Sequence, residues 1–154
     1  MAAKMRLTKE LKNIQKSPVL KASGISVYLQ CDSDLLVWNA NIPAPKGSLY
    51  EGANFKLEIY FSERYPFEPP KMIKFQKPIP YHLNVGQSDG LVCIGLLKPD
   101  QWDPAASCME NVLASILAAL AQPQTDSFVD DDVNNTYIHN RSSYQERARR
   151  SVKI

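Results

Sequence analysis

The amino-acid sequence predicts an α+β domain with an N-terminal helix, a four-stranded antiparallel meander, a long irregular segment and C-terminal helices. Three observations carry this prediction. Apolar residues recur at helical spacing near the N-terminus, four stretches of alternating apolar and polar residues follow with short links, and helical spacing returns after residue 106. The 154 residues fit one domain covering positions 1–154, since no internal repeat, low-complexity tract or domain boundary interrupts them.

The first helix is expected over Met1–Lys16. Leu7, Leu11 and Ile14 recur at a spacing that places them on one face. Ser17–Pro18 should end this helix, because proline disfavours helical backbone before it and has no N–H group to donate.

Four strands are expected next. The first follows Gly24 and alternates through Ile25, Val27 and Leu29, and the other three are Leu35–Ile42, Asn54–Phe61 and Lys71–Gln76. The third has the clearest alternation, which predicts a sheet with one face on the core and the other in water.

Residues 77–106 show no regular pattern, and ordered loops of that length are commonly functional. A helix should begin at Ser107, where Ser107 and Glu110 match a capping box, and end at Gln122–Pro123. A last helix should follow Asp130–Asp132 and carry the four residues Val133, Tyr137, Tyr144 and Ala148.

Charge is distributed unevenly along the chain. Residues 1–21 carry six basic side chains and one acidic side chain, whereas the remaining residues carry 12 basic and 15 acidic ones. A protein partner is the favoured interpretation, because no aromatic residues interleave the basic ones as nucleic-acid stacking requires. A solvated helix face, a basic patch that binds RNA, and a membrane surface are the alternatives.

Composition limits the classes of function. Three cysteines do not make a disulfide framework, which predicts a reducing compartment, the cytoplasm or the nucleus. No apolar run reaches the roughly 20 residues of a membrane span, so no spanning helix is expected, and neither a membrane nor a nucleic acid is the favoured partner. The two histidines and three cysteines lack metal-ligand spacing, and no glycine-rich phosphate loop is present.

The stretch from Tyr81 to Trp102 holds the candidate chemistry. Cys93 is either a nucleophile, with Asn84 as a nearby hydrogen-bond donor, or a small buried apolar residue in a loop. Cys108, at the first turn of a predicted helix, is the rival nucleophile, and Cys31 is expected to be a structural or exposed thiol.

Several motifs then coincide. Tyr65-Pro-Phe-Glu-Pro-Pro70, His82-Leu-Asn84, Gly90-Leu-Val-Cys93 and Trp102-Asp-Pro104 occur in this order, followed by Tyr137 to Arg149 in a helical pattern. Together they resemble the ubiquitin-conjugating enzymes, with the UBC fold, over essentially the whole chain. The N-terminal residues and the Tyr-Pro-Phe turn look closest to the L-type enzymes, which work with HECT and RING-between-RING ligases.

The resemblance implies a thioester relay. Cys93 would accept ubiquitin from an activating enzyme and pass it to a ligase cysteine or a substrate lysine. No cofactor is implied, since the activating enzyme uses the ATP. Asn84 would donate to the oxyanion or hold the loop that covers the site, and His82 would brace the loop by hydrogen bonding.

The resemblance also implies a partner surface at Arg6, Lys9, Phe67 and Pro104. Ligases of the HECT, RING-between-RING or RING type and the activating enzyme would share it, so charging and discharge would exclude one another. From the sequence alone, Phe67 is either an exposed aromatic anchor or an inward-packing residue.

The chain departs from the family pattern at several positions. Leu83 replaces a proline, the spacing from Asn84 to Cys93 is one residue longer than usual, and Gly95 replaces an acidic residue or proline. Glu68 and Asp103 place acidic groups on the ligase surface, and Ser127, beside Asp126, lies where an acidic residue or histidine gates attack by lysine. They leave open whether the chain modifies lysine directly or only passes ubiquitin to a ligase cysteine. Leu83 and the longer spacing also leave open a non-catalytic binding module with this fold, and conjugation of another ubiquitin-like protein is a further alternative.

Overall fold

The structure is a computed structural model that describes residues 2–152. Within that range the helices are α1 (Ala2–Lys16), α2 (Pro18–Ala22), α3 (Met109–Ala121), α4 (Asp131–His139) and α5 (Arg141–Ser151), with a 3-10 turn η1 (Gly95–Leu97). The strands are β1 (Ser26–Cys31), β2 (Asp34–Pro43), β3 (Asn54–Tyr60) and β4 (Met72–Phe75). Each strand pairs with the next in antiparallel orientation, which confirms the predicted meander.

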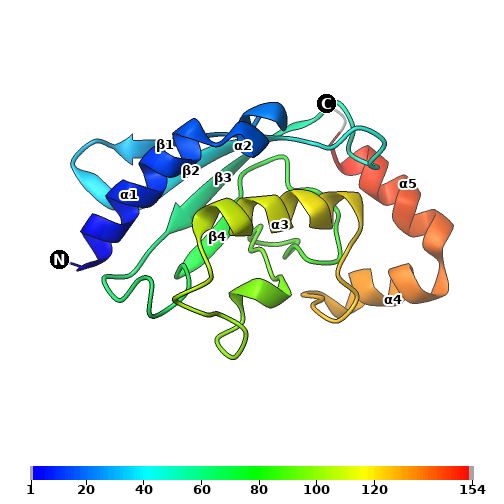
Figure 1. Cartoon of the computed structure of the whole chain (residues 1–154). Helices are drawn as coiled ribbons and strands as arrows, with labels where there is room; N and C mark the ends of the chain where they lie inside the picture. The colour runs from blue at the N-terminus through cyan, green and yellow to red at the C-terminus, as the bar shows by residue number, and fades with distance from the viewer. Residues whose placement is uncertain (1, 153–154) are drawn as a thin grey trace.

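The sheet has one covered face and one wet face. Helices α1 and α3 lie across the covered face, while α4 and α5 extend from one end of the molecule (Figure 1). In β3, Phe55, Leu57 and Ile59 are buried and Lys56 is exposed, as the alternation predicts. None of the helices within residues 2–152 is both long and apolar enough to cross a membrane.

Helix α1 packs as its spacing predicts, with Leu7 and Ile14 buried. Its end at Lys16 is also as expected, but a second helix that the sequence analysis missed begins directly afterwards. The Ser17 hydroxyl accepts a hydrogen bond from the Leu20 amide at 3.3 Å, and Pro18 occupies the first helical position. Proline has no N–H group to leave unpaired there and its backbone angle suits a helix, so the residue that stops α1 also starts α2.

The predicted capping box at the start of α3 is wrong. The helix begins at Met109, and the Ser107 hydroxyl accepts from the Asp103 amide at 3.2 Å instead of capping the helix. The Met109 amide donates to Glu10 of α1 at 2.7 Å. A carboxylate from a distant helix thus satisfies a donor that local sequence was expected to satisfy.

The single C-terminal helix that the sequence predicts is two helices. Asn140 separates α4 from α5, and its side chain accepts from the Ser143 amide at 3.2 Å, capping α5. Asparagine side chains compete for backbone groups in this way, which favours a helix start over a continuous helix. Val133 and Tyr144 are buried as expected.

Glu10 is the main polar group within this core. It is 5% exposed, and its carboxylate accepts from the Met109 amide, from Arg6 Nε at 2.8 Å and from Tyr65 Oη at 2.6 Å. Burial and the hydrogen bond to Glu10 raise the pKa of Tyr65, so its hydroxyl keeps the proton that it donates. The carboxylate therefore joins α1, α3 and the loop after β3.

Replacing Glu10 by Ala should lower the free energy of unfolding by about 2–4 kcal/mol, because two buried donors and the partly buried Arg6 lose their acceptor. Glu10→Gln keeps an acceptor oxygen and should lose less. Urea unfolding measures both, with Glu68→Ala as the control. Glu68 pairs with Arg64 at 3.0 Å in an exposed ion pair, so its loss should cost about 0.5 kcal/mol or less. Equal losses for the two alanine variants would contradict this account.

Candidate active site

The segment between β4 and α3 is largely irregular, as predicted, yet its first part is in the interior. Residues 81–86 are buried in succession. A buried backbone without sheet or helix must find its hydrogen-bond partners elsewhere. In this segment many of those partners are side chains, and they determine the position of the candidate residues.

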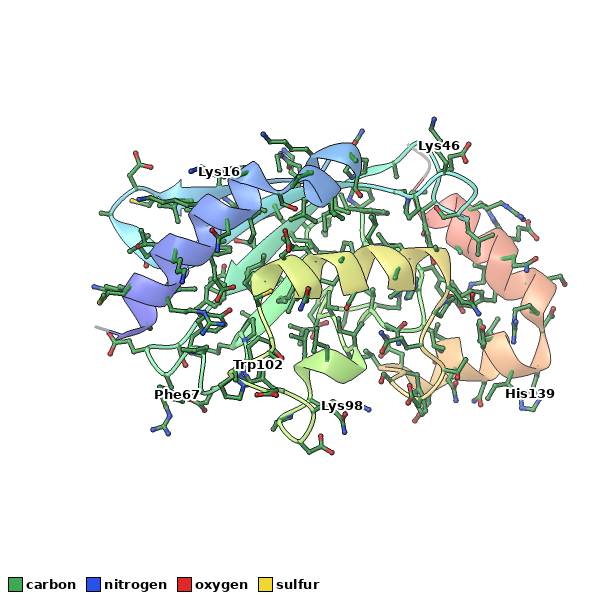
Figure 2. All side chains as sticks on the ribbon, in the orientation of Figure 1. Lys16, Lys46, Phe67, Lys98, Trp102 and His139 are labelled. Carbon is green, nitrogen blue, oxygen red and sulfur yellow. The ribbon has the colours of Figure 1, made fainter. Side chains whose placement is uncertain are left out.

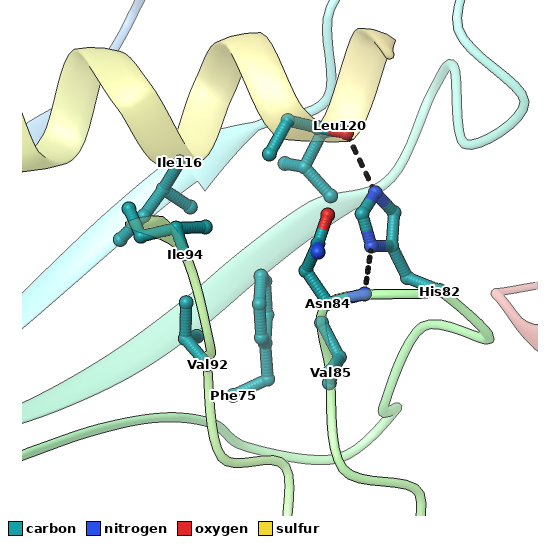
Figure 3. A pocket seen from close by; sticks show the side chains of 9 residues that line it. Phe75, His82, Asn84, Val85, Val92, Ile94, Ile116 and Leu120 are labelled. Carbon is teal, nitrogen blue, oxygen red and sulfur yellow. Dashed lines mark hydrogen bonds between the residues drawn. The ribbon is translucent and has the colours of Figure 1, made fainter. Parts of the chain in front are cut away.

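His82 is 1% exposed and uses both ring nitrogens. Nε2 lies 2.6 Å from the Ala119 carbonyl, to which it donates, and Nδ1 accepts from the Asn84 amide at 2.9 Å (Figure 3). A proton on Nδ1 would face that amide donor, so the geometry requires a neutral imidazole. Burial lowers the pKa of His82 to about 4, although the bond to Ala119 opposes the shift. The geometry agrees with bracing and leaves no ring nitrogen free to act as a base.

Asn84 is also 1% exposed, and its side-chain amide is fully engaged. Nδ2 donates to the carbonyls of Gln124 and Ser127, both at 2.9 Å, and Oδ1 accepts from the Gln124 amide at 2.9 Å. Both amide hydrogens are therefore committed to the segment that follows α3. Of the two roles expected for Asn84, this arrangement matches loop holding. Donation to an oxyanion would require one of these bonds to break.

Leu83 takes part in the same framework. Its side chain is buried, and its backbone N–H donates to Tyr144 Oη of α5 at 3.1 Å. A proline at this position has no N–H group and could not make that bond. Leucine at this position therefore allows a hydrogen bond with α5 that proline would not, and His82 and Asn84 keep the contacts described above.

The longer spacing between Asn84 and Cys93 is absorbed within a turn. Val85 pairs with Val92 in an antiparallel bridge, so the two ends of the turn lie opposite one another. Gly90 closes the turn at φ +76°, where a side chain would collide with the Phe75 carbonyl. The additional residue therefore does not separate the two ends of the turn.

Cys93 lies just beyond this turn and is half-buried. Its amide donates to the Asn84 carbonyl at 2.8 Å, so the sequence motif does bring these two residues side by side. Two residues later, the Gly95 amide donates to Gln124 Oε1 at 2.8 Å. Gln124 was missed in the sequence analysis, because no local pattern marks a residue that reaches across 29 positions.

A small pocket lies beneath this framework, lined by apolar residues of β4, α3 and the loop together with His82 and Asn84 (Figure 3). Its free volume is about 10 Å³, which holds one water molecule at most. Cys93 does not line it. A group that reacts with this thiol must therefore approach it from the molecular surface and not from this pocket.

The expected partner surface combines α1 with two loops. Trp102 Nε1 donates to the Pro66 carbonyl at 2.7 Å and joins the loops that carry Phe67 and Pro104 (Figure 2). Phe67 is 71% exposed, which rules out the inward-packing alternative. Lys9 is exposed and Pro104 is partly exposed.

Arg6, the remaining member of the expected partner surface, is only partly available. Its guanidinium binds Glu10 and the Ser107 carbonyl, the latter at 3.0 Å. The acidic departure at Glu68 is balanced by its ion pair with Arg64. The other acidic departure, Asp103, is exposed and accepts from the Ala105 amide at 3.0 Å.

The other two thiols lack this framework. Cys31 is exposed at the end of β1, where its hydrogen bond with the Ser33 hydroxyl lowers its pKa. Cys108 is half-buried immediately before Met109, the first residue of α3, whose amide donates to Glu10. Within residues 2–152, no group of three or more potential metal-binding side chains lies close enough to hold an ion.

Comparisons with known proteins agree with this geometry. The family model described as ubiquitin-conjugating enzyme matches residues 6–152. A probable ubiquitin-conjugating enzyme E2 of Acanthamoeba polyphaga mimivirus is 32% identical over 144 residues, which cover 94% of this chain and 88% of the relative.

A solved structure is similar as well. It is the E2 domain of a Toxoplasma gondii ubiquitin conjugating enzyme, with a TM-score of 0.80 and 32% identity over 96% of this chain and 94% of that one. The expected UBC fold is therefore confirmed, while the L-type subclass stays a prediction. The match spans the sheet, the irregular segment and the helices at both ends, and the chain belongs to the ubiquitin-conjugating enzyme family.

Proposed function

We propose that this protein carries ubiquitin as a thioester on Cys93. In charging, the Cys93 thiolate attacks the thioester carbonyl that joins ubiquitin to the cysteine of the activating enzyme. A bond forms between that carbonyl carbon and Cys93 Sγ, and the thiolate of the activating enzyme leaves. The family membership and the position of Cys93 beside Asn84 support this proposal.

Discharge is the same kind of exchange, with Cys93 now as the leaving group instead of the nucleophile. A ligase thiolate or a substrate amine attacks the carbonyl, the bond to Cys93 Sγ breaks, and Cys93 leaves as a thiolate. An attacking amine releases its proton to solvent. A thiolate is both a strong nucleophile and a good leaving group, which suits a carrier that must accept and release the same acyl group.

The observation that carries the proposal is the half-buried position of Cys93 on a braced backbone. The thiol lies outside the interior pocket, on the hydrogen-bonded framework of His82 and Asn84. A protein with a flexible C-terminal tail can deliver its last residue to such a thiol. A small-molecule enzyme would be expected to enclose its substrate in a concave pocket.

The first prediction concerns charging. Incubation with activating enzyme, ATP and ubiquitin should give a shifted band that thiol reagents remove. Cys93→Ser should give a thiol-resistant ester band, because an oxygen ester resists thiol exchange. Cys31→Ser and Cys108→Ser are the matched controls and should charge like the unmodified protein.

Three results would change the conclusion. A thiol-sensitive band that persists in Cys93→Ser but disappears in Cys108→Ser would assign the chemistry to the rival cysteine. If ubiquitin gives no band and another ubiquitin-like protein does, the cargo is that protein. If none gives a band, the chain is a binding module.

The second prediction concerns His82 as a brace. Its pKa of about 4 in the folded state lies below the ordinary 6.5, so the unfolded state binds the proton first as the pH falls. The contribution of neutral His82 to the free energy of unfolding should be complete above pH 6.5. It should decline by about 3 kcal/mol as the pH falls from 6.5 to 4. Urea unfolding across this range should show a shallower decline for His82→Gln.

His139→Gln is the control for this measurement, because it removes the other histidine of the chain from an exposed position. It should leave the pH profile unchanged. If His82→Gln and the unmodified protein lose stability equally over this range, His82 is not held neutral by the fold.

The third prediction concerns the partner surface. Phe67→Ala should slow transfer to a HECT ligase domain about tenfold or more, because exposed aromatic anchors carry much of the energy of an interface. Thermal stability should change little, since the side chain is 71% exposed. Ile138→Ala, at another exposed apolar position on α4, is the matched control. Equal transfer by both variants would argue against a ligase surface at Phe67.

A further inference from the structure

The backbone around Cys93 is held by a closed ring of hydrogen bonds. The Cys93 amide donates to the Asn84 carbonyl at 2.8 Å, and Asn84 exchanges two bonds of 2.9 Å with the backbone of Gln124. The Gln124 side chain closes the ring, because its Oε1 accepts from the Gly95 amide at 2.8 Å. The ring therefore fixes the chain on both sides of Cys93.

Gly95 is the position in the ring that most needs an external support. It has no side chain of its own to pack, and glycine backbone has more conformational freedom than that of any other residue. It also begins η1, whose preceding residue provides no side-chain cap. The Gln124 carboxamide is thus the group that holds the first amide of this turn.

We propose that Gln124 is a positioning residue for the discharge of the Cys93 thioester. Its Oε1 keeps the Cys93–Gly95 backbone at a fixed distance from Asn84, and so sets the direction in which the thioester carbonyl points. The inference rests on the thioester function proposed for Cys93. It assigns a role to a residue that no motif of the sequence marks.

Discharge should depend on this ring more than charging does. During charging the reacting carbonyl is held by the activating enzyme, and Cys93 supplies only the attacking sulfur. During discharge the carbonyl is attached to Cys93 itself, so any rotation of the Cys93–Gly95 backbone moves the reacting atoms. Displacements of about 1 Å from reactive geometry can cost about 10²-fold in rate.

The test is single-turnover discharge of the purified thioester to free cysteine, whose thiolate attacks the carbonyl and releases the Cys93 thiolate. Gln124→Ala should discharge about tenfold more slowly, with the charging rate within about twofold of the unmodified protein. Gln124→Glu keeps an acceptor oxygen for the Gly95 amide and should discharge within about threefold. Gln122→Ala, at an exposed glutamine of the same segment, should change neither rate.

A second variant removes the other partner of the bond. Gly95→Pro has no N–H group to donate, and the extended backbone of Ile94 (φ −127°, ψ 156°) accommodates a following proline. Because the proline ring fixes φ at residue 95 without this bond, the variant should discharge within about threefold of the unmodified protein. The double variant with Gln124→Ala should be no slower than Gly95→Pro alone, because the bond that Gln124 accepts is already absent.

Three outcomes would overturn the inference. These are normal discharge by Gln124→Ala, equally slow discharge by Gln124→Glu and Gln124→Ala, and slower discharge by the double variant than by Gly95→Pro alone. The second outcome would assign the effect to the Gln124 amide nitrogen, since only the oxygen acceptor survives in glutamate. A failure of the unmodified protein to charge would instead overturn the thioester proposal, so the two failures are distinguishable.

Discussion

The structure depends on how a buried segment without regular secondary structure satisfies its backbone hydrogen bonds. Residues 81–86 pass through the interior, where an unpaired amide costs about 1–3 kcal/mol. Side chains accept from several amides: Ser151 from Tyr81 at 2.9 Å, Tyr144 from Leu83 at 3.1 Å, and His82 from Asn84 at 2.9 Å. The shape of the region around Cys93 therefore depends on the packing of α3 and α5 against this segment.

The same constraint accounts for two departures from the family pattern. Proline in place of Leu83 or Gly95 would have no amide N–H to donate. Here each amide has a partner, Tyr144 Oη for Leu83 and Gln124 Oε1 for Gly95. The chain thus adds hydrogen bonds where proline would restrict the backbone directly, and Asn84 still lies beside Cys93.

Both the core and the region around Cys93 place a polar side chain at a junction of elements. Glu10 joins α1, α3 and the loop that follows β3, and Asn84 joins the irregular segment to residues 124–127. Each is nearly inaccessible to solvent and has several partners. Buried polar groups of this kind are stabilising only when all of their partners are present, so they also specify one arrangement of the elements.

The sequence by itself determined the elements whose signals are local. Apolar periodicity predicted the strands and the buried faces of α1 and α3, and the order of motifs around Cys93 predicted the family. The second helix at Pro18 and the break at Asn140 were missed, although each has a local signal: proline both stops and starts helices, and asparagine caps them.

Only the tertiary structure decided which polar groups meet. The contact of Glu10 with Met109 spans 99 positions, and that of Asn84 with Gln124 spans 40. The outward direction of Phe67 likewise follows from the loops around it. Periodicity and turn chemistry act over a few residues, whereas a hydrogen bond between distant residues exists only after the elements pack. For that reason the sequence predicted Cys93 and Asn84 as site residues but not the bonds that hold them together.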